Sequence, residues 1–200
     1  MARRSDHSRD ELRDMALNAA EDIVANEGYF ALSTRRVATA IGYTVGTLYL
    51  VFRNFDDLIL QINARTLDAL SARLAIAEGE PEGVARVLAL GRAYLGFATE
   101  RPRRWRMVFE HRMAAGAPLP DWYGEKVARL FGVVENALRP VLKDRPDPEL
   151  MTAARVIWSG VHGICLLEVT ERLEAVGSPP GAALVESLIV QYLRGLRASA

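Results

Sequence analysis

Two short helical segments separated by a glycine, residues 33–41 and 44–52, constrain the fold of this chain more than any other feature. Ser33 or Thr34 can cap the first segment, and Gly42 is well placed to end it. Each segment is too short to be stable unless it packs against other parts of the chain. The sequence therefore predicts a compact local unit in which the apolar side chains of both segments are buried together.

Helical spacing continues on both sides of this unit. Between residues 8 and 28, apolar side chains recur at three- and four-residue steps, and the pattern stops at Gly28. A long helix is expected from Asn54 to about Glu78, with Asp56 and Asp57 favourable in its first turn. Further helical patterns cover residues 82–100, 102–114, 120–143, 147–175 and 181–197. No convincing strand pattern is present, so the predicted fold class is all-α with about nine helices.

Local charge is more informative than total charge. The chain has 200 residues, 50% of them hydrophobic, which is enough to bury a sizeable core in one or two domains. Its 25 basic and 25 acidic side chains cancel, so net charge indicates neither a nucleic-acid nor a membrane partner. Residues 29–55, however, contain Arg35, Arg36 and Arg53 and no acidic residue. This segment carries the positive charge that attraction to phosphate requires.

The two short helices, packed on the first helix, have the size and spacing of a helix-turn-helix. Leu48 and Phe52 would face inward in such a unit, while the end that Thr44 caps would face outward and enter a DNA major groove. The predicted DNA contacts are Arg3, Arg4, Thr34, Arg35, Tyr43, Thr44, Val45, Gly46, Thr47, Tyr49, Leu50, Arg53 and Asn54.

A known family shares this pattern. Residues 8–60, which include STRRVATAIGYTVGTLYLVFRNFDDLI at 33–59, resemble the DNA-binding domain of TetR-type transcriptional repressors. Residues 93–102, AYLGFATERP, and 156–164, VIWSGVHGI, resemble the regulatory domain of a subgroup named for Trp, His and Gly. The corresponding residues here are Trp158, His162 and Gly163. The resemblance implies an all-helical homodimer that binds a palindromic operator and releases it when a small-molecule effector enters the C-terminal domain.

The chain departs from the family pattern in its second short helix. Family members often carry polar or aromatic residues where this chain has Leu50 and Val51, and often Lys where it has Phe55. Without that Lys, a phosphate contact is expected to shift to the backbone N–H groups at the helix start and to Arg53 and Asn54. Leu50 is expected to contact a thymine methyl group. These departures keep open an alternative, a helical small-molecule-binding regulator with weak or lost operator recognition.

The expected functional division is a helix-turn-helix DNA-binding domain over 1–54 and a helical ligand-binding and dimerisation domain over 55–200. Aromatic and sulfur-containing residues gather in the middle of the second domain, where ordinary core packing is the simpler interpretation of each one. The family resemblance favours a pocket for a drug-sized apolar ligand among them. The predicted ligand-binding residues are Tyr94, Phe97, Trp105, Phe109, Met113, Trp122, Phe131, Trp158 and His162.

The last two predicted helices are apolar over most of their circumference. Such helices need cover on two sides, and at the end of a chain of this size a twin subunit supplies the second cover most simply. The predicted dimer interface consists of Ile157, Val161, Ile164, Leu184, Leu188, Ile189 and Tyr192.

Other classes of function lack support in the sequence. No nucleophile with a base, paired carboxylates or phosphate loop stands out, so an enzyme is not expected. His162, Cys165 and Glu168 lie three apart on one helix, but this spacing drifts around the helix, and neither a metal nor another cofactor is expected. A single cysteine, no membrane-spanning apolar run and no signal-peptide pattern at the N-terminus favour a cytoplasmic protein. Its expected partners are operator DNA, an effector and a second copy of the chain.

Overall fold

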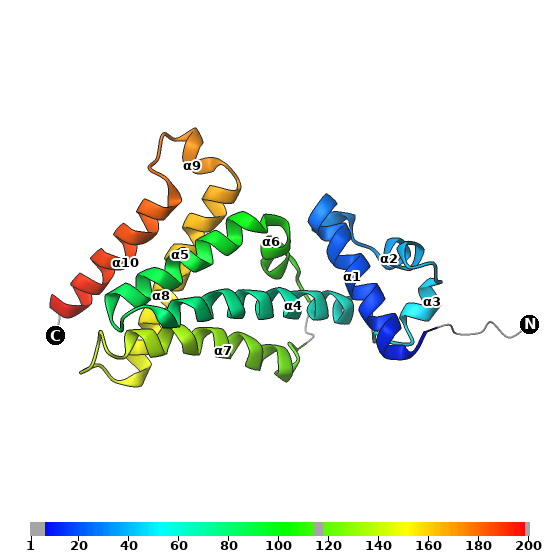
Figure 1. The fold of residues 1–200 in the computed structure, drawn as a ribbon, viewed down its shortest axis with the longest axis horizontal. Helices are drawn as coiled ribbons and strands as arrows, with labels where there is room; N and C mark the ends of the chain where they lie inside the picture. Colours follow the sequence, from blue (N-terminus) through cyan, green and yellow to red (C-terminus); the bar gives the residue numbers. More distant parts are fainter. Residues whose placement is uncertain (1–6, 114–117, 199–200) are drawn as a thin grey trace, which may run out of the picture. The chain divides into compact units, whose positions relative to one another are not determined.

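The structure is a computed structural model that describes residues 7–113 and 118–198. Within these residues all regular elements are helices, which confirms the predicted all-α fold (Figure 1). The helices of the first half are α1 (Arg9–Glu27), η1 (Tyr29–Ala31), α2 (Thr34–Ala40), α3 (Val45–Leu48), α4 (Phe55–Ala75) and η2 (Ile76–Gly79). Those of the second half are α5 (Val84–Glu100), α6 (Pro102–Glu110), α7 (Asp121–Leu138), α8 (Asp147–Val169), α9 (Arg172–Ala175) and α10 (Gly181–Ala198).

The chain divides into two compact units. The first comprises the chain up to Thr66 together with the α6 region from Arg103, and the second comprises Leu67–Pro102 and the chain from Asp121 onward. The expected boundary after residue 54 was drawn by function and stays a prediction. The contacts show in addition that α6 groups with the N-terminal helices, although α5 precedes it in the sequence.

Local signals at both ends define α1. The Ser8 hydroxyl accepts a hydrogen bond from the Glu11 backbone N–H at 3.2 Å, and the Glu11 carboxylate accepts one from the Ser8 N–H at 2.7 Å. This reciprocal capping box satisfies two donors that the helix itself leaves unpaired. Gly28 ends the helix with φ of 88°, a conformation that glycine adopts without a steric penalty. One face of α1 is buried in the core of the first unit through Leu12, Ala16, Leu17, Ala20 and Val24.

The predicted helix-turn-helix is present as α2, a turn at Gly42 and α3 (Figure 1). Gly42 has φ of 74°, so the turn uses a backbone conformation that favours glycine. Leu48 and Phe52 are 1% and 3% exposed and belong to the core cluster that also contains the buried residues of α1. The two short helices are therefore stabilised by burial against α1, as the sequence predicted.

The second short helix ends earlier than expected. It was predicted to run to about Phe52, but the regular α-helix stops at Leu48. The N–H groups of Leu50 and Val51 donate to carbonyls three residues back, at 3.1 and 3.0 Å. These bonds tighten the chain into turns, and Phe52 still donates to the Leu48 carbonyl at 3.0 Å. The segment therefore stays coiled and keeps Phe52 facing inward.

Arginines attach α6 to α1. Arg103 donates to the carbonyl of Ala25 at 3.0 Å and to that of Asn26, both in the last turn of α1. Arg104 forms an ion pair with Glu21 at 2.9 Å. The basic cluster at the start of α6 thus satisfies carbonyls that a helix end leaves unpaired.

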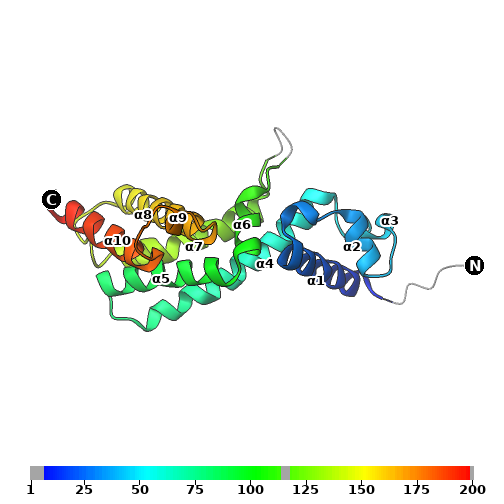
Figure 2. The same ribbon diagram turned by 90° about the horizontal axis from the view of Figure 1, so that it is seen from above.

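Close glycine contacts organise the second unit, in which α5, α8 and α10 lie side by side (Figures 1 and 2). A Cβ atom at Gly91 of α5 would lie 2.7 Å from Ile189 Cδ1 of α10. A Cβ atom at Gly160 of α8 would lie 2.5 Å from Leu188 Cδ2 of α10. Both distances are far below van der Waals contact, so a side chain at either position would force Ile189 or Leu188 to shift.

Helices α7 and α8 are also shorter than the segments predicted for them. The segment predicted over 120–143 ends as α7 at Leu138, because Pro140 disfavours helical backbone in the residue before it. The segment predicted over 147–175 is interrupted after Val169 by Glu171, whose φ is 58°. The last four residues of that segment then form the separate helix α9.

By length and composition alone, α8 is the one helix of the described residues that could span a membrane. Helix α8 packs against α5, α7 and α10. The long apolar sequence of α8 is therefore equally typical of a core helix in a soluble bundle.

Candidate functional site

The side chains that α3 presents outward form a candidate nucleic-acid interface. Thr44 and Gly46 are exposed, Tyr49 is 49% exposed and Leu50 is 61% exposed, while Thr47 is half-buried. We refer to these residues, 44, 46, 47, 49 and 50, as the α3 surface. Its shape follows from the burial of Leu48, Val51 and Phe52, which turns the residues between them outward.

Three other predicted DNA contacts lie deeper. Tyr43 and Val45 are half-buried and pack against the core of the first unit. The Tyr43 hydroxyl lies 2.7 Å from His7 Nδ1, within hydrogen-bonding distance. Thr34 is half-buried in the first turn of α2. These three half-buried residues lie beneath or beside the α3 surface and are less accessible to DNA than its exposed residues.

The arginines near the α3 surface differ in their pairing. Arg36 forms an ion pair with Glu27 and donates to the carbonyl of Ala31 at 3.3 Å. The hydrogen bond from Arg36 lowers the pKa of the Glu27 carboxyl and raises that of Arg36. Arg35 and Arg53 are exposed, and their side chains form no ion pair within the part of the chain that the structure describes. They are therefore available to phosphate, whereas Arg3 and Arg4 lie outside the described residues.

The start of α4 is already capped. The Asn54 side-chain carbonyl accepts a hydrogen bond from the Asp57 N–H at 2.8 Å, and the Asp57 carboxylate accepts one from the Arg53 N–H at 2.8 Å. Two of the backbone donors expected to bind phosphate are thus occupied by side chains. The Arg53 guanidinium and the Asn54 side-chain NH₂ group remain for DNA.

A buried histidine joins three segments of the first unit. The side chain of His111, just after α6, is 6% exposed. Its Nδ1 lies 3.0 Å from the Tyr29 hydroxyl, and its Nε2 lies 3.2 Å from the Asp56 carboxylate without the alignment of a hydrogen bond. Burial lowers the pKa of His111, although Asp56 opposes this. No sequence signal connects positions so far apart, so only the fold could reveal this cluster.

The structure brings together four of the nine predicted ligand-binding residues. The Tyr94 hydroxyl on α5 lies 2.9 Å from His162 Nδ1 on α8, a hydrogen-bonding distance. The Trp158 ring is 5.3 Å from the His162 ring, and the Phe131 ring of α7 is 5.4 Å from that of Trp158. Burial lowers the pKa of His162, which keeps the imidazole neutral near pH 7. These four side chains form an aromatic cluster with one polar pair.

The other five predicted ligand-binding residues are distributed over both units. Phe97 is buried in α5, and Trp122 is 41% exposed on α7, both in the second unit. Trp105 is 1% exposed, Phe109 is 43% exposed and Met113 is half-buried, all three in the first unit. Neither unit alone contains all nine residues, so neither unit alone forms the predicted pocket.

Three of the seven predicted dimer-interface residues are buried within the single chain. Ile157, Val161 and Ile189 are 5%, 3% and 0% exposed, covered by the helices of their own unit. The predicted stripe on α8 is thus a core face of the single chain, so these three residues are not accessible to a second copy. The remaining predicted residues, Ile164, Leu184, Leu188 and Tyr192, are half-buried.

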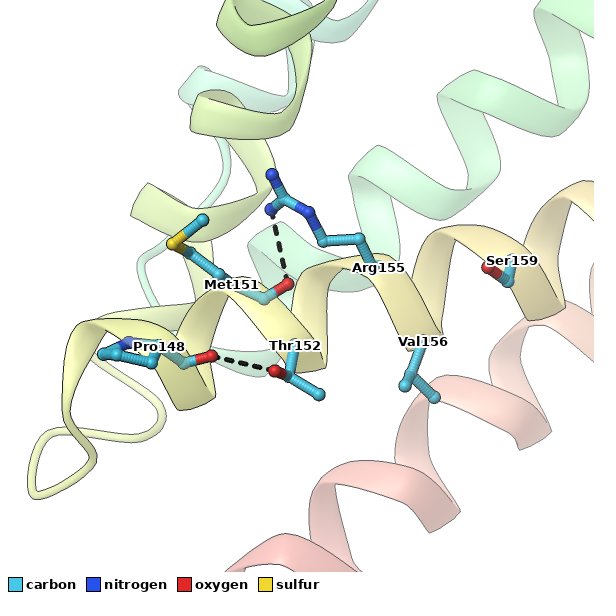
Figure 3. Close-up of a pocket in the computed structure, with 6 residues that line it drawn as sticks. All are labelled: Pro148, Met151, Thr152, Arg155, Val156 and Ser159. Atoms are coloured by element: carbon cyan, nitrogen blue, oxygen red, sulfur yellow. Dashed lines mark hydrogen bonds between the residues drawn. The ribbon is translucent and has the colours of Figure 1, made fainter.

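The opposite face of α8 is the apolar surface that remains uncovered. Met151 is 45% exposed, and Val156, Leu166 and Leu167 are each 43% exposed. A shallow hollow of about 570 Å³ lies on this face, lined by Pro148, Met151, Thr152, Arg155, Val156 and Ser159 (Figure 3). None of the nine predicted ligand-binding residues lines it.

No metal site was expected at His162, Cys165 and Glu168 because of their spacing along the helix. The structure shows in addition that Cys165 is buried. Burial raises the pKa of its thiol to about 12, so the thiol stays protonated at neutral pH. Across residues 7–113 and 118–198, no three His, Cys, Asp or Glu side chains come together as a metal site would require.

A helix-turn-helix packed on a first helix, followed by a larger helical body, defines the class of helix-turn-helix regulators. Comparison with protein families agrees with this class. Residues 16–62 match the model of bacterial regulatory proteins of the tetR family, and residues 87–192 match the tetracyclin repressor-like C-terminal domain. The chain therefore belongs to the TetR family of transcriptional regulators, as the sequence motifs indicated.

Individual relatives are distant. An HTH-type transcriptional regulator of Mycobacterium tuberculosis, Rv0681, is 24% identical over 92% of this chain and 81% of its own length. A solved structure from Rhodococcus sp. RHA1, of unknown function, has a TM-score of 0.77 with 23% identity and covers 96% of this chain and 98% of its own. The multidrug binding protein EbrR has a TM-score of 0.62 with 20% identity and covers 94% and 96% of the two chains. At these identities the solved structures show that the fold is shared.

Proposed function

We propose that this protein is a ligand-responsive transcriptional repressor that binds a palindromic operator as a homodimer. The observation that carries the proposal is the exposed α3 surface, together with the exposed guanidinium groups of Arg35 and Arg53, which form no ion pair among the residues that the structure describes. The N-terminal end of the second helix of a helix-turn-helix is the part that contacts base edges. Cations beside it would bind the phosphates and set its register. Such a protein acts where the chromosome is, in the cytoplasm.

The dimer would place two recognition helices about 34–36 Å apart, one turn of duplex. We propose that the exposed face of α8, with Val156 and Leu167, contributes to the contact between the two copies, because it is the uncovered apolar surface of that helix. An isologous contact needs only that this face match itself across a two-fold axis.

We propose that a small molecule releases the operator by binding in the second unit, near the aromatic cluster of Tyr94, Phe131, Trp158 and His162. Aromatic walls with a few polar groups suit an apolar, drug-sized ligand. The multidrug binding of EbrR, which shares the fold, supports an effector of this kind. Release requires that the effector bind one spacing of the recognition helices better than the other.

The first test is a mobility shift of the purified protein on the DNA upstream of its own gene, at two salt concentrations and with scrambled DNA as competitor. We expect a sequence-selective shift that weakens as salt rises, because phosphate contacts release counterions. The contrary outcome is no selective shift on the upstream DNA and no preferred site after selection from random DNA. In that case the repressor function is replaced by the alternative, a small-molecule-binding regulator with weak or lost operator recognition.

A further inference from the structure

The segment that forms α3 and its flanks has an unusual chemical composition for a DNA reader. Residues 42–52, GYTVGTLYLVF, contain no Asn, Gln, Arg, Lys, Asp or Glu. In the major groove, Arg and Lys read guanine, Asn and Gln read adenine, and acidic side chains read cytosine. The α3 surface therefore lacks the side chains that identify these three bases through hydrogen bonds.

The hydroxyl groups of this segment are largely engaged within the protein. Thr44 Oγ1 and Thr47 Oγ1 are hydrogen bonded at 2.9 Å, and Thr44 Oγ1 also accepts from the Thr47 N–H at 3.3 Å. Because each hydroxyl carries one hydrogen, this pair keeps a single O–H donor for DNA. The Tyr43 hydroxyl is hydrogen bonded with His7. Donation of hydrogen bonds to base edges by these hydroxyls is thus limited to one threonine O–H and the Tyr49 hydroxyl.

Leu50 is the apolar side chain that the fold leaves in this surface. It is 61% exposed, whereas its neighbours Val51 and Phe52 are 7% and 3% exposed. Its N–H donates to the Thr47 carbonyl at 3.1 Å, which holds Leu50 at the end of α3. Gly46, one turn earlier, has only Thr44 Oγ1, at 3.8 Å, near the position of a Cβ atom. The surface beside Leu50 is therefore open to close approach by a base edge.

We infer that α3 reads thymine through the C5 methyl group, with Leu50 as the residue that determines this specificity. This inference rests on the proposed operator binding. Thymine is the one base that presents an apolar group in the major groove, and aliphatic side chains contact that group. Each operator half-site would then carry an A·T pair under Leu50, and its methyl group would contribute to affinity without any hydrogen bond.

The test uses an operator selected from random duplex DNA with the full-length protein. Each thymine of the half-site is replaced in turn by uracil, which removes the methyl group and preserves base pairing. At one position, affinity should fall about fourfold, the factor that corresponds to losing the burial of one methyl-sized group. The Leu50→Ala variant should bind the thymine and uracil forms of that position equally.

A matched control separates this effect from a general loss of an aliphatic side chain. Ile76, in η2, is 68% exposed and lies far from the α3 segment in sequence. The Ile76→Ala variant should keep the fourfold preference for thymine.

Failure of the inference differs from failure of the proposed function. Absence of any selected site would mean that the protein does not recognise an operator, which removes the basis of both. Selective binding in which no thymine-to-uracil change alters affinity would overturn methyl reading and leave operator binding intact. A thymine preference that persists in Leu50→Ala would assign the methyl contact to another residue and overturn the role of Leu50.

Discussion

At the residue scale, the exposed side chain of Tyr49 stands apart from the core of the first unit. Tyr49 is half exposed and is absent from the core of the first unit, whereas Tyr43 packs against that core. Exposed aromatic side chains in a basic surface are suited to contact nucleic acid through the ring and the hydroxyl. Removing Tyr49 should therefore affect binding and leave folding unchanged.

The Tyr49→Ala variant should weaken operator binding by about 1–2 kcal/mol, roughly 5- to 30-fold. Titration of labelled operator, with the melting temperature measured in parallel, checks this expectation. The control is Phe30→Ala, because Phe30 is 90% exposed on η1 and outside the α3 surface. Unchanged affinity of Tyr49→Ala would remove this residue from the interface.

At the scale of elements, helices are positioned by contacts that are distant in the sequence. Arg103 holds α6 against the last turn of α1 and Arg104 holds it to Glu21, one to two turns earlier. His111, beyond the other end of α6, contacts Tyr29 and Asp56. In the second unit, Gly91 allows α5 to approach α10 closely. Each of these contacts predicts a separable effect on stability.

Filling the space at Gly91 should destabilise the second unit. Gly91→Leu places a side chain where Ile189 Cδ1 and Val185 Cγ1 already lie, at 2.7 and 2.9 Å from the position of the new Cβ. Overpacking of this kind costs about 1–3 kcal/mol, so the melting temperature should fall by several degrees, on the order of 2–4 °C per kcal/mol. The control is Gly124→Leu on α7, where no atom lies within 4 Å of the new Cβ. Equal stability of the two variants would contradict close packing of α5 on α10.

Acidification should loosen the contact that His111 makes. Because burial lowers its pKa in the folded state, the stability that neutral His111 contributes is complete above its unfolded pKa of about 6.5 and is lost as pH falls through the lower folded value. The charged and titratable groups around it are Tyr29 on η1, Asp56 on α4 and Glu110 on α6, which in turn pairs with Arg106.

The measurement is the melting temperature of the wild type and of His111→Gln between about pH 5 and pH 8. The wild type should lose more stability than the variant below about pH 6.5. His162, whose pKa burial also lowers, is present in both proteins and contributes equally to both curves. Parallel curves would show that His111 does not couple folding to protons.

At the scale of the whole molecule, the buried and exposed faces of α8 bear on the proposed dimer. The face with Leu150, Ala154 and Ile157 is used within the chain, and the face with Val156 and Leu167 is uncovered. The uncovered face is also concave, because it contains the shallow hollow lined by Met151, Arg155 and Val156 among others (Figure 3). A self-complementary contact would bury these side chains in both copies.

The double variant Val156→Asp, Leu167→Asp should convert a dimer into a monomer, because the two copies would bring four carboxylates into one apolar contact. Light scattering after size-exclusion chromatography measures the mass directly. The control, Val176→Asp, changes a valine that is 77% exposed just after α9, and it should leave the mass unchanged. A double variant that remains dimeric would place the interface on another surface.

Most of the fold could be predicted from the sequence because helices are specified locally. Apolar spacing, caps such as Ser33 and Thr44, and the turn at Gly42 act within a few residues, so the α2–turn–α3 unit followed from the chain itself. Its outward residues did not all follow, because Tyr43 and Val45 pack against the core. Helix ends were less accurate where competing local bonds decided them, as at Leu50 and after Val169.

The sequence by itself determined the helical class, the helix-turn-helix and the acid-free basic segment, because periodicity and composition are properties of neighbouring residues. Only the tertiary structure decided that Arg36 is paired with Glu27, that His111 contacts Tyr29 and Asp56, and that Ile157 lies in the core of its own chain. Each of these facts depends on which distant segment packs against which face. Several packings can satisfy the same apolar pattern, and the contacts of the folded chain select one of them.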